Sequence, residues 1–502
     1  MTESMTNISP FDKPILSVEG LGVRTSSTDG EKVILKDISF SINRGQVLAI
    51  TGETGSGKTM TAKAIMGMLP RGLVTEGKIM LGSLSLLELE AKEMQKIRGR
   101  KMGMAFQNPE TALNPLLKNR KLLDLTMGRG KEGQIERLSL FGLKDKRILD
   151  SFPFELSGGM AQRFMTALSL GQGVDLVIFD EPTRGLDPES RDLLIDMIKI
   201  LSKDRGIGVL VLTHDMVFIE RICENCLVIQ DGKIVESGPA TDILMNPKSS
   251  YMKKIKESDP RSNQILPKMR PKRHGQKPLM EIKKLSCSYN MSIFKKDRHK
   301  VLNDLNLEIF KGEVLGIMGG SGCGKTTLAA CILGLINYSG EILYEGEPIR
   351  GRRGPSLGLI SQSATSSFDP ALPIGSSLRE VFLVHPEYKE EDPEAQIREV
   401  LELVEMSQLY GRLDSYPSEF SGGQLQRFAI ARTLLSRAQI LILDEITSML
   451  DLINQAAIIR LLYHLREEKD LTYLFISHDL PLAKQFCDRM MRMQDGRLEE
   501  MI

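Results

Sequence analysis

The 502-residue chain has no tryptophan, few aromatic residues (5%) and almost no net charge. Lys and Arg together number 66 and Asp and Glu 65, so the overall charge favours neither nucleic acid nor another strongly charged partner. Six cysteines are spread over the sequence without a disulfide framework, which fits a reducing cytoplasm. At this length we expect two or more domains rather than a single core.

Long hydrophobic runs are also missing. No stretch of 18 or more apolar residues occurs, so the sequence predicts no transmembrane helix. The N-terminal segment lacks the basic start and apolar centre of a secretory signal. If the protein works at a membrane, another chain must therefore supply the membrane span.

One pair of cysteines, Cys223 and Cys226 in RICENC, has the CxxC spacing of metal and redox sites. No second pair completes a four-ligand zinc site. Cys487 in QFCDRM follows Cys223 by 264 residues, and that copy has no second cysteine. We therefore interpret Cys223 as a repeated helix feature.

The sequence contains a long internal duplication. The peptide LSGGMAQR at residues 156–163 returns as FSGGQLQR at residues 420–427. Lys58 in GETGSGKT returns as Lys325 in GGSGCGKT, 267 residues later. FDEPT and LTHD return as LDEIT and ISHD, each after 264 residues. Such offsets indicate the repetition of a whole domain.

Each half alternates strand-like apolar runs with helix-rich segments. QVLAI and EVLGIM precede the glycine loops, and the later runs are DLVIFDE, ILILDE, GVLVLTHD and TYLFISHD. Near-continuous Val, Ile and Leu without polar alternation is typical of parallel strands buried on both faces. The alternation predicts an α/β fold in each half.

GETGSGKT and GGSGCGKT match the GxxxxGK[ST] phosphate loop, and each follows a strand-like run. Lys58 and Lys325 would reach the β- and γ-phosphates, and Thr59 and Thr326 would ligate Mg²⁺. The loop glycines would let backbone N–H groups curl around phosphate oxygens. These glycines are Gly52, Gly55, Gly57, Gly319, Gly322 and Gly324.

An acidic pair ends one apolar run in each half. Asp180 and Asp444 can hold the Mg²⁺ that bridges the phosphates. Glu181 and Glu445, which follow directly, can orient or deprotonate an attacking water. A histidine follows the next apolar run of each half, where it is either structural or functional; the two are His214 and His478.

Together these motifs make each half similar to the nucleotide-binding domain of an ATP-binding cassette (ABC) ATPase. The resemblance covers nearly the whole chain, and the SGG peptides resemble the signature motif of that family. It implies tandem P-loop NTPase domains, each with a RecA-like core, an antiparallel β subdomain and a helical signature subdomain. It also implies ATP hydrolysis with Mg²⁺ at two sites, sandwiched between halves that pair head-to-tail.

The resemblance assigns roles residue by residue. Glu181 and Glu445 would be the catalytic carboxylates, and the two histidines would contact the γ-phosphate. Gln107 and Gln362 would join the threonines and aspartates at Mg²⁺. Each phosphate loop would face the signature of the other half: Ser421, Gly423 and Gln424 for the first site, and Ser157, Gly159 and Met160 for the second. Asp187 and Asp451 resemble the D-loop residues that cross between the halves.

Two positions depart from the family pattern. Met160 stands where the signature usually has Gln, as Gln424 does in the second copy. Because phosphate contacts there come mainly from the backbone and Ser157, we expect this site still to close on ATP. Tyr289 fits the aromatic residue that stacks on adenine in the family, whereas the first half has Thr25 at the matching position. The first site is therefore expected to bind nucleotide more weakly.

A segment rich in proline, polar and basic residues separates the halves. We interpret residues 256–278 as a linker between domains at residues 1–255 and 279–502. Its basic run, residues 268–277, is either a solvated tether or a contact for phosphate or lipid headgroups. It contains no cysteine, so we expect no iron–sulfur centre in it.

Three peptides resemble the dipeptide, oligopeptide and nickel uptake family: FQNPETALNP, SQSATSSFDP and NPKSSYMKKI. This resemblance implies integral-membrane permease subunits and an extracytoplasmic solute-binding protein as partners, and no nucleic acid. It implies a peripheral place on the cytoplasmic face of the membrane. The cargo, whether a peptide, nickel or a metal chelate, stays open.

The alternative is a soluble tandem ABC ATPase of translation or DNA repair. Translation factors of that kind usually carry a long, charged helical linker, and repair relatives carry zinc modules or long coiled coils. The short, proline-containing linker of this chain counts against both. A fused sugar-importer ATPase is disfavoured because its second site tends to be degenerate, whereas Lys325 and Glu445 are intact here.

Overall fold

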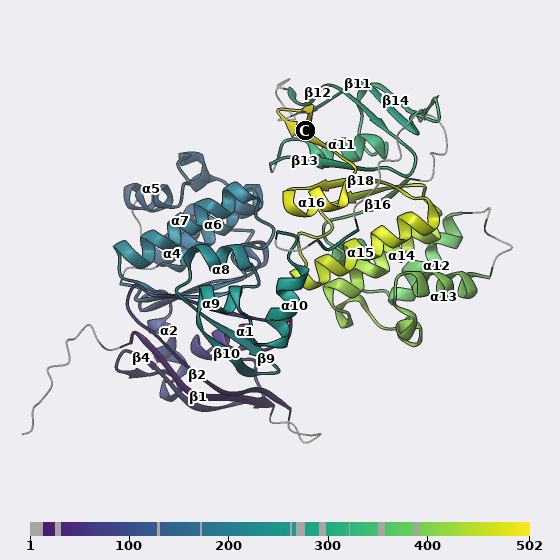
Figure 1. Cartoon of the computed structure of the whole chain (residues 1–502). Coiled ribbons are helices and arrows are strands. Elements are labelled where there is room, and N and C mark those ends of the chain that lie inside the picture. The colour runs from purple at the N-terminus through teal and green to yellow at the C-terminus, as the bar shows by residue number, and fades with distance from the viewer. Residues whose placement is uncertain are drawn as a thin grey trace, which may run out of the picture. The chain divides into compact units, whose positions relative to one another are not determined.

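The computed structural model describes residues 14–25, 32–127, 131–170, 173–261, 264–267, 277–290, 298–320, 322–349, 357–385, 388 and 392–501. The chain divides into two compact units, Met1–Lys256 and Glu257–Ile502. Each unit contains one six-stranded sheet, one four-stranded antiparallel sheet and a set of helices (Figure 1). Most of the basic run at residues 268–277 lies outside the described residues.

The central sheet of the first unit has the strand order β6-β7-β8-β3-β9-β10, with only β10 antiparallel to its neighbour. β3, β7 and β8 are buried along their whole length, which confirms the expectation for the apolar runs. The strands are β3 (Val47–Gly52), β6 (Met102–Ala105), β7 (Leu176–Asp180), β8 (Gly208–Leu212), β9 (Asn225–Gln230) and β10 (Lys233–Pro239).

The antiparallel sheet of the first unit has the order β2-β1-β4-β5. Its inner face shares a hydrophobic core with the central sheet and α1. In Figure 1 this sheet lies at the end of the unit away from α4, α5 and α6. The strands are β1 (Leu16–Thr25), β2 (Val33–Ile42), β4 (Leu73–Leu81) and β5 (Leu84–Ser85).

Most helices of the first unit follow strands of the central sheet or fill the insert between β6 and β7, and one lies between β5 and β6. They are α1 (Lys58–Ile65), α2 (Ala91–Ile97), α3 (Pro109–Ala112), α4 (Asn119–Met127), α5 (Lys131–Leu140), α6 (Gly158–Ser169), α7 (Pro188–Lys199), α8 (Met216–Ile222), α9 (Ala240–Met245) and α10 (Ser250–Ser258). The π-helical turn Ile200–Asp204 continues α7.

The second unit repeats this topology. Its sheets have the orders β16-β17-β18-β13-β19-β20 and β12-β11-β14-β15. The strands are β11 (Met280–Asn290), β12 (Arg298–Ile309), β13 (Val314–Met318), β14 (Ser339–Tyr344), β15 (Glu347–Pro348), β16 (Leu357–Ile360), β17 (Ile440–Asp444), β18 (Thr472–Ser477), β19 (Arg489–Gln494) and β20 (Arg497–Met501). The helices are α11 (Lys325–Ile332), α12 (Ile374–Val384), α13 (Pro393–Leu403), α14 (Gly422–Leu435), α15 (Leu452–Lys469) and α16 (Leu480–Phe486).

The two SGG peptides begin α6 and α14, and their serines cap the helices. The Ser157 hydroxyl accepts the Met160 N–H at 3.4 Å, and the Ser421 hydroxyl accepts the Gln424 N–H at 3.3 Å. In α14 the Gln424 side chain also accepts the Ser421 N–H at 2.9 Å, which completes a capping box. Met160 has only a weakly accepting thioether sulfur and α6 shows no capping box, so the start of α6 has one fewer capping interaction.

The glycines after these serines permit close packing. A Cβ atom on Gly159 would lie 2.8 Å from the Ser190 hydroxyl, and one on Gly423 would lie 3.0 Å from the Asn454 side chain. Ser190 and Asn454 belong to the first turns of α7 and α15, which Asp187 and Asp451 cap. Each SGG helix is therefore packed against the D-loop helix of its own unit.

Several sequence features have plain structural roles. Cys223 and Cys487 occupy the same place, directly after α8 and α16, and Cys223 and Cys226 are both buried. Burial raises the pKa of the Cys226 thiol to about 12, so it is a neutral core group. Among the described residues, no helix is both long and apolar enough to cross a bilayer.

We predict that Met160→Gln stabilises the start of α6 by about 0.5–1.5 kcal/mol, because it supplies the missing half of the capping box. Protection of the first turn of α6 against hydrogen exchange measures this gain. Gln424→Met should produce the opposite change at α14. ATP turnover should change little, and a several-fold rise in Met160→Gln would contradict our expectation that the site closes normally.

Candidate functional site

The phosphate-loop residues of each unit lie between a buried strand and the first turn of a helix. β3 leads into Gly52–Thr59 and α1, and β13 leads into the second loop and α11. Gly57 and Gly324 precede the helices with φ of 110° and 111°, a region that side chains other than glycine rarely adopt. The N-terminal N–H groups of α1 and α11 therefore point into the loop, as an anion site requires.

The lysine of each loop turns back over it. Lys58 Nζ donates to the Gly52 carbonyl at 2.5 Å and the Glu53 carbonyl at 3.0 Å. Lys325 Nζ donates to the carbonyls of Gly319 and Gly320, both at 2.9 Å. The ammonium groups thus lie at the mouth of the loops, where they can pair with phosphate oxygens.

A threonine and an aspartate meet beside each lysine. The Thr59 hydroxyl lies 3.2 and 3.3 Å from the two carboxylate oxygens of Asp180 at the end of β7. Thr326 lies 3.2 Å from an Asp444 oxygen at the end of β17. A hydroxyl beside a carboxylate is a pair of hard oxygen donors, which fits Mg²⁺. The structure thus brings together the threonine and the aspartate that the sequence predicts as Mg²⁺ ligands in each unit.

Burial raises the pKa of Asp180 to about 6, with a further contribution from the negative charge of Glu181. Burial, followed by the charge of Glu445, also raises the pKa of Asp444. Both aspartates are therefore carboxylates that would gain from a bound cation.

Glu181 and Glu445 have the unusual backbone that often marks a functional residue. Both have φ of 49°, a left-handed conformation that costs energy for a residue other than glycine. Their N–H groups bond to Leu212 at 2.8 Å and Ile476 at 2.9 Å, and these bonds hold the turn against the neighbouring strand. This strain was not predictable from sequence, because it depends on where the parallel strands end.

Each glutamate faces the histidine of its own unit. His214 Nδ1 lies 2.8 Å from Glu181 Oε2, and His478 Nδ1 lies 3.6 Å from Glu445 Oε1. Burial alone would raise the pKa of Glu181 and Glu445. The hydrogen bonds and charge of the histidines, helped by Lys58 and Lys325, outweigh burial and lower both pKa values. Both carboxylates are thus ionised near neutral pH and able to accept a proton.

The second unit adds a contact from the glutamine predicted for Mg²⁺. Gln362 follows β16, and its Nε2 donates to Glu445 Oε2 at 3.1 Å and to the Ser448 hydroxyl at 3.2 Å. Lys325 Nζ also lies 3.5 Å from Glu445. Gln107 holds the matching place after β6 in the first unit. The structure therefore brings Gln362 to the catalytic-type carboxylate of its unit.

The remaining predicted residues lie at helix starts or strand ends. Ser157, Gly159, Ser421, Gly423 and Gln424 form the first turns of α6 and α14. Tyr289 lies near the end of β11 with 42% of its surface exposed. The Thr25 hydroxyl, at the end of β1, accepts the Lys32 N–H at 3.0 Å.

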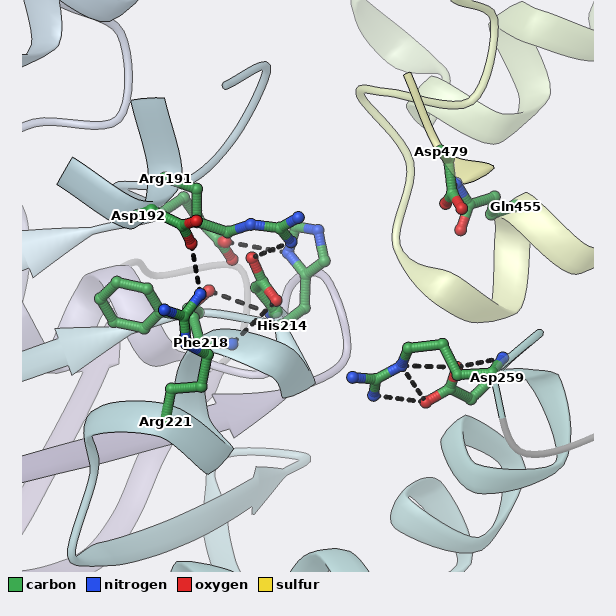
Figure 2. Close-up of polar contacts among 12 residues, drawn as sticks. Arg191, Asp192, His214, Phe218, Arg221, Asp259, Gln455 and Asp479 are labelled. Carbon is green, nitrogen blue, oxygen red and sulfur yellow. Dashed lines mark hydrogen bonds and ion pairs between the residues drawn. The ribbon is translucent and has the colours of Figure 1, made fainter. Parts of the chain in front are cut away.

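Sequence reasoning missed an ion pair behind His214. Arg191 of α7 contacts Asp215 at 3.4 Å, and Asp215 caps α8 through the Phe218 N–H at 3.1 Å (Figure 2). In the second unit Gln455 takes the place of Arg191 and donates to Asp479 at 3.5 Å. The 264-residue offset of the repeat could have revealed the Arg-to-Gln difference.

We predict that Asp180→Asn stabilises the nucleotide-free protein at about pH 8 by about 1–3 kcal/mol. In the folded state the pKa of Asp180 is raised from 3.8 to about 6, so ionisation costs stability as the pH rises through that window. The gain should be lost near pH 4, where the carboxyl is largely protonated in the folded protein. Urea unfolding followed by circular dichroism, without nucleotide or Mg²⁺, measures it.

Asp196→Asn, at an exposed site on α7, is the matched control and should change stability by less than about 0.5 kcal/mol. A loss of stability in Asp180→Asn at pH 8 would show that the bond to Thr59 outweighs the cost of burying the charge.

Comparison with known proteins gives matches to both halves. A family model described as ABC transporter matches residues 35–184 and 302–448. The uncharacterized ABC transporter ATP-binding protein YejF of Escherichia coli (strain K12) is 32% identical over 97% of this chain and 95% of its own length. The peptidoglycan transport ATP-binding protein YejF of Agrobacterium fabrum is 30% identical, covering 97% and 92%. The glutathione import ATP-binding protein GsiA of Shigella dysenteriae is 31% identical, covering 97% and 86%.

A solved structure also resembles the chain over both units. The archaeal ribosome recycling factor aABCE1, in complex with the ribosomal stalk protein aP1, covers 95% of this chain and 89% of its own with a TM-score of 0.60. Its sequence identity is 23%, so this likeness concerns the fold alone.

Proposed function

Because the chain belongs to the ABC transporter family, we propose that it is the ATP-hydrolysing, energy-coupling subunit of a membrane importer. One observation carries the proposal: each unit holds a phosphate-loop lysine, a Thr–Asp pair and a left-handed glutamate facing a histidine. The lysine, the aspartate, the glutamate and the histidine are present in both units, so we propose that each unit hydrolyses ATP.

In this mechanism the chain's own groups position water and neutralise charge. Glu181 or Glu445 accepts a proton from water as its oxygen attacks the γ-phosphorus, and ADP leaves. Lys58 or Lys325 leaves its loop carbonyls to pair with the β- and γ-phosphates. His214 or His478, which lies beside the glutamate of its own unit, contacts the γ-phosphate. Thr59 with Asp180, and Thr326 with Asp444, would hold Mg²⁺, which supplies positive charge to the phosphates, with Gln107 and Gln362 as further ligands.

The proposal also pairs the two units head-to-tail, so that each phosphate loop is completed by the SGG helix of the other unit. The helix starts at Ser157 and Ser421 support it. Each offers free N–H groups and a hydroxyl to an anion. A phosphate bound there would be stabilised by the positive end of the helix dipole. ATP binding would then close the pair and hydrolysis would reopen it.

Exposed apolar side chains support a protein partner at the helical inserts. Leu116 is 84% exposed and Phe154 70% exposed in the first unit, and Leu383 is 82% exposed in the second. Large apolar side chains on a surface often mark interaction sites. In the proposal, permease subunits bind here and keep the protein peripheral on the cytoplasmic face of the membrane, and a solute-binding protein delivers the cargo outside.

The names of two relatives favour a peptide-type solute as the cargo. One is named for peptidoglycan transport and one for import of glutathione, which is a tripeptide. We propose a short peptide or a related amide as cargo, in preference to nickel or a metal chelate. The alternative, a soluble tandem ATPase of translation or DNA repair, is supported here by fold matches at 22–23% identity, against relatives at 30–32% identity over 97% of this chain.

We predict that Glu181→Gln and Glu445→Gln each lower kcat for ATP hydrolysis by at least about 100-fold at their own site, because general-base catalysis is worth about 10²–10⁴. The double variant should be inactive but still bind ATP. Release of inorganic phosphate and equilibrium binding of labelled ATP separate the two effects. Full activity in the double variant would remove both glutamates from the mechanism.

We predict that the tagged chain, purified from gently solubilised membranes, brings a pair of multi-span permease proteins with it. Leu116→Asp combined with Leu383→Asp should abolish this association without lowering ATP binding, because both side chains are exposed. Val235→Asp, at an exposed site on β10, is the control and should retain the permeases. Ribosomal or DNA-repair proteins without any membrane protein would overturn the importer assignment.

A further inference from the structure

The helix that follows each histidine determines where that histidine lies. α8 begins at Asp215, and its carboxylate accepts the Phe218 N–H at 3.1 Å. α16 begins at Asp479, and its carboxylate accepts the Leu482 N–H at 3.0 Å. His214 and His478 directly precede these caps, so a shift of either helix moves the histidine relative to its glutamate.

In the first unit, ion pairs fasten α8 to α7. Arg191 contacts Asp215 at 3.4 Å, and Arg221 near the end of α8 pairs with Asp192. Figure 2 shows Arg221 reaching Asp192. The two pairs lie near the two ends of this short helix and join it to α7 within the first unit.

The second unit lacks the residues for both pairs. The positions that match Arg191, Asp192 and Arg221 hold Gln455, Ala456 and Gln485. Gln455 still reaches the cap Asp479, but as a neutral donor at 3.5 Å. At that length the bond is weak. Leu482, Ala483 and Phe486 pack α16 into the same hydrophobic core as α15, so the two units differ in the polar contacts of this helix.

A peptide between the halves adds hydrogen bonds to both α15 and α16. We call residues 259–261 and 264–267 the docked peptide. The Gln485 side chain accepts the Ile265 N–H at 2.7 Å and donates to the Pro260 carbonyl at 2.7 Å. Arg460 of α15 donates to the Ile265 carbonyl at 3.3 Å. The peptide thus bridges α15 and α16.

Two apolar side chains of the docked peptide are buried beside these hydrogen bonds. Ile265 and Leu266 are 7% and 3% exposed and belong to the same hydrophobic core as α15 and α16. At the start of the peptide, the Asp259 carboxylate accepts the Arg261 N–H at 2.9 Å and two further bonds from its guanidinium at 3.0 Å (Figure 2). Part of the segment interpreted from sequence as a linker is therefore a fixed element of the second unit.

We propose that the docked peptide positions the His478 helix, with Gln485 as its positioning residue, so that turnover at Glu445 depends on the connection between the halves. The first site, fastened by its own ion pairs, has no such dependence. The peptide directly follows α10 along the chain, so the connection between the halves runs through the residues that contact α16. This inference rests on the proposed ATPase function of the second unit.

The test is Gln485→Leu in the full chain, which removes both bonds to the peptide and keeps the side-chain volume similar. We expect hydrogen exchange in residues 480–486 to rise about tenfold, because two partly buried hydrogen bonds are lost. Residues 216–222 in the first unit serve as the internal reference and should not change. The exchange measurement needs no ATP, so it stands whether or not the chain hydrolyses ATP.

Steady-state kinetics of ATP hydrolysis test whether the position of α16 affects catalysis. In a Glu181→Gln background, which leaves hydrolysis to Glu445, kcat for ATP should fall several-fold while KM stays the same, because the phosphate loop of the second unit is untouched. Adding Gln455→Arg to the variant should restore kcat, since it places an arginine beside Asp479 as Arg191 lies beside Asp215. Gln408→Leu, at an exposed glutamine, is the matched control and should leave exchange and kcat unchanged.

Each outcome decides the proposal. Faster exchange in α16 with a lower, rescuable kcat supports it. Unchanged exchange shows that the peptide does not hold α16, and faster exchange with unchanged kcat shows that holding α16 does not serve catalysis; either result overturns it. If the wild-type chain has no ATPase activity, the proposed function itself is wrong. The results for the variants alone do not test that function.

Discussion

The structure depends on a pair of carboxylates placed at the buried end of a parallel strand. Burial raises the pKa of Asp180 to about 6, while His214 and Lys58 lower the pKa of the adjacent Glu181. Two neighbouring acids thereby acquire different properties: one gains from a cation and the other is ready to accept a proton. The strained turn at Glu181, the phosphate loop and the histidine are all arranged around that pair.

Both halves of the duplication keep the carboxylate pair, but the residues that hold the surrounding helices differ between them. The two central sheets have the same strand order, and both glutamates share the same φ of 49°. The supports differ at the SGG helices, where only Gln424 completes a capping box, and at the helices after the histidines. A change in the residues around a site can alter the rate of hydrolysis without altering the catalytic groups. Two copies in one chain can therefore come to differ in rate while keeping the same mechanism.

Much of this fold could be predicted from sequence, because its main determinants are local. Apolar runs gave the buried parallel strands, and the glycine loops marked the strand-to-helix turns with Lys58 and Lys325. The docked peptide escaped prediction because a proline-containing polar stretch carries no periodic signal, and its burial of Ile265 depends on contacts with α15 and α16. The capping box at Gln424 did have a local signal, a glutamine three residues after a serine.

The most direct test of the account is whether one chain makes both composite sites by itself. Light scattering should be combined with a count of bound nucleotide on the chain carrying Glu181→Gln and Glu445→Gln, in the presence of ATP and Mg²⁺. The account predicts a particle with the mass of a single chain that holds two ATP molecules. A particle of two chains, or a single chain that retains one ATP or none, would contradict the head-to-tail pairing of the two halves.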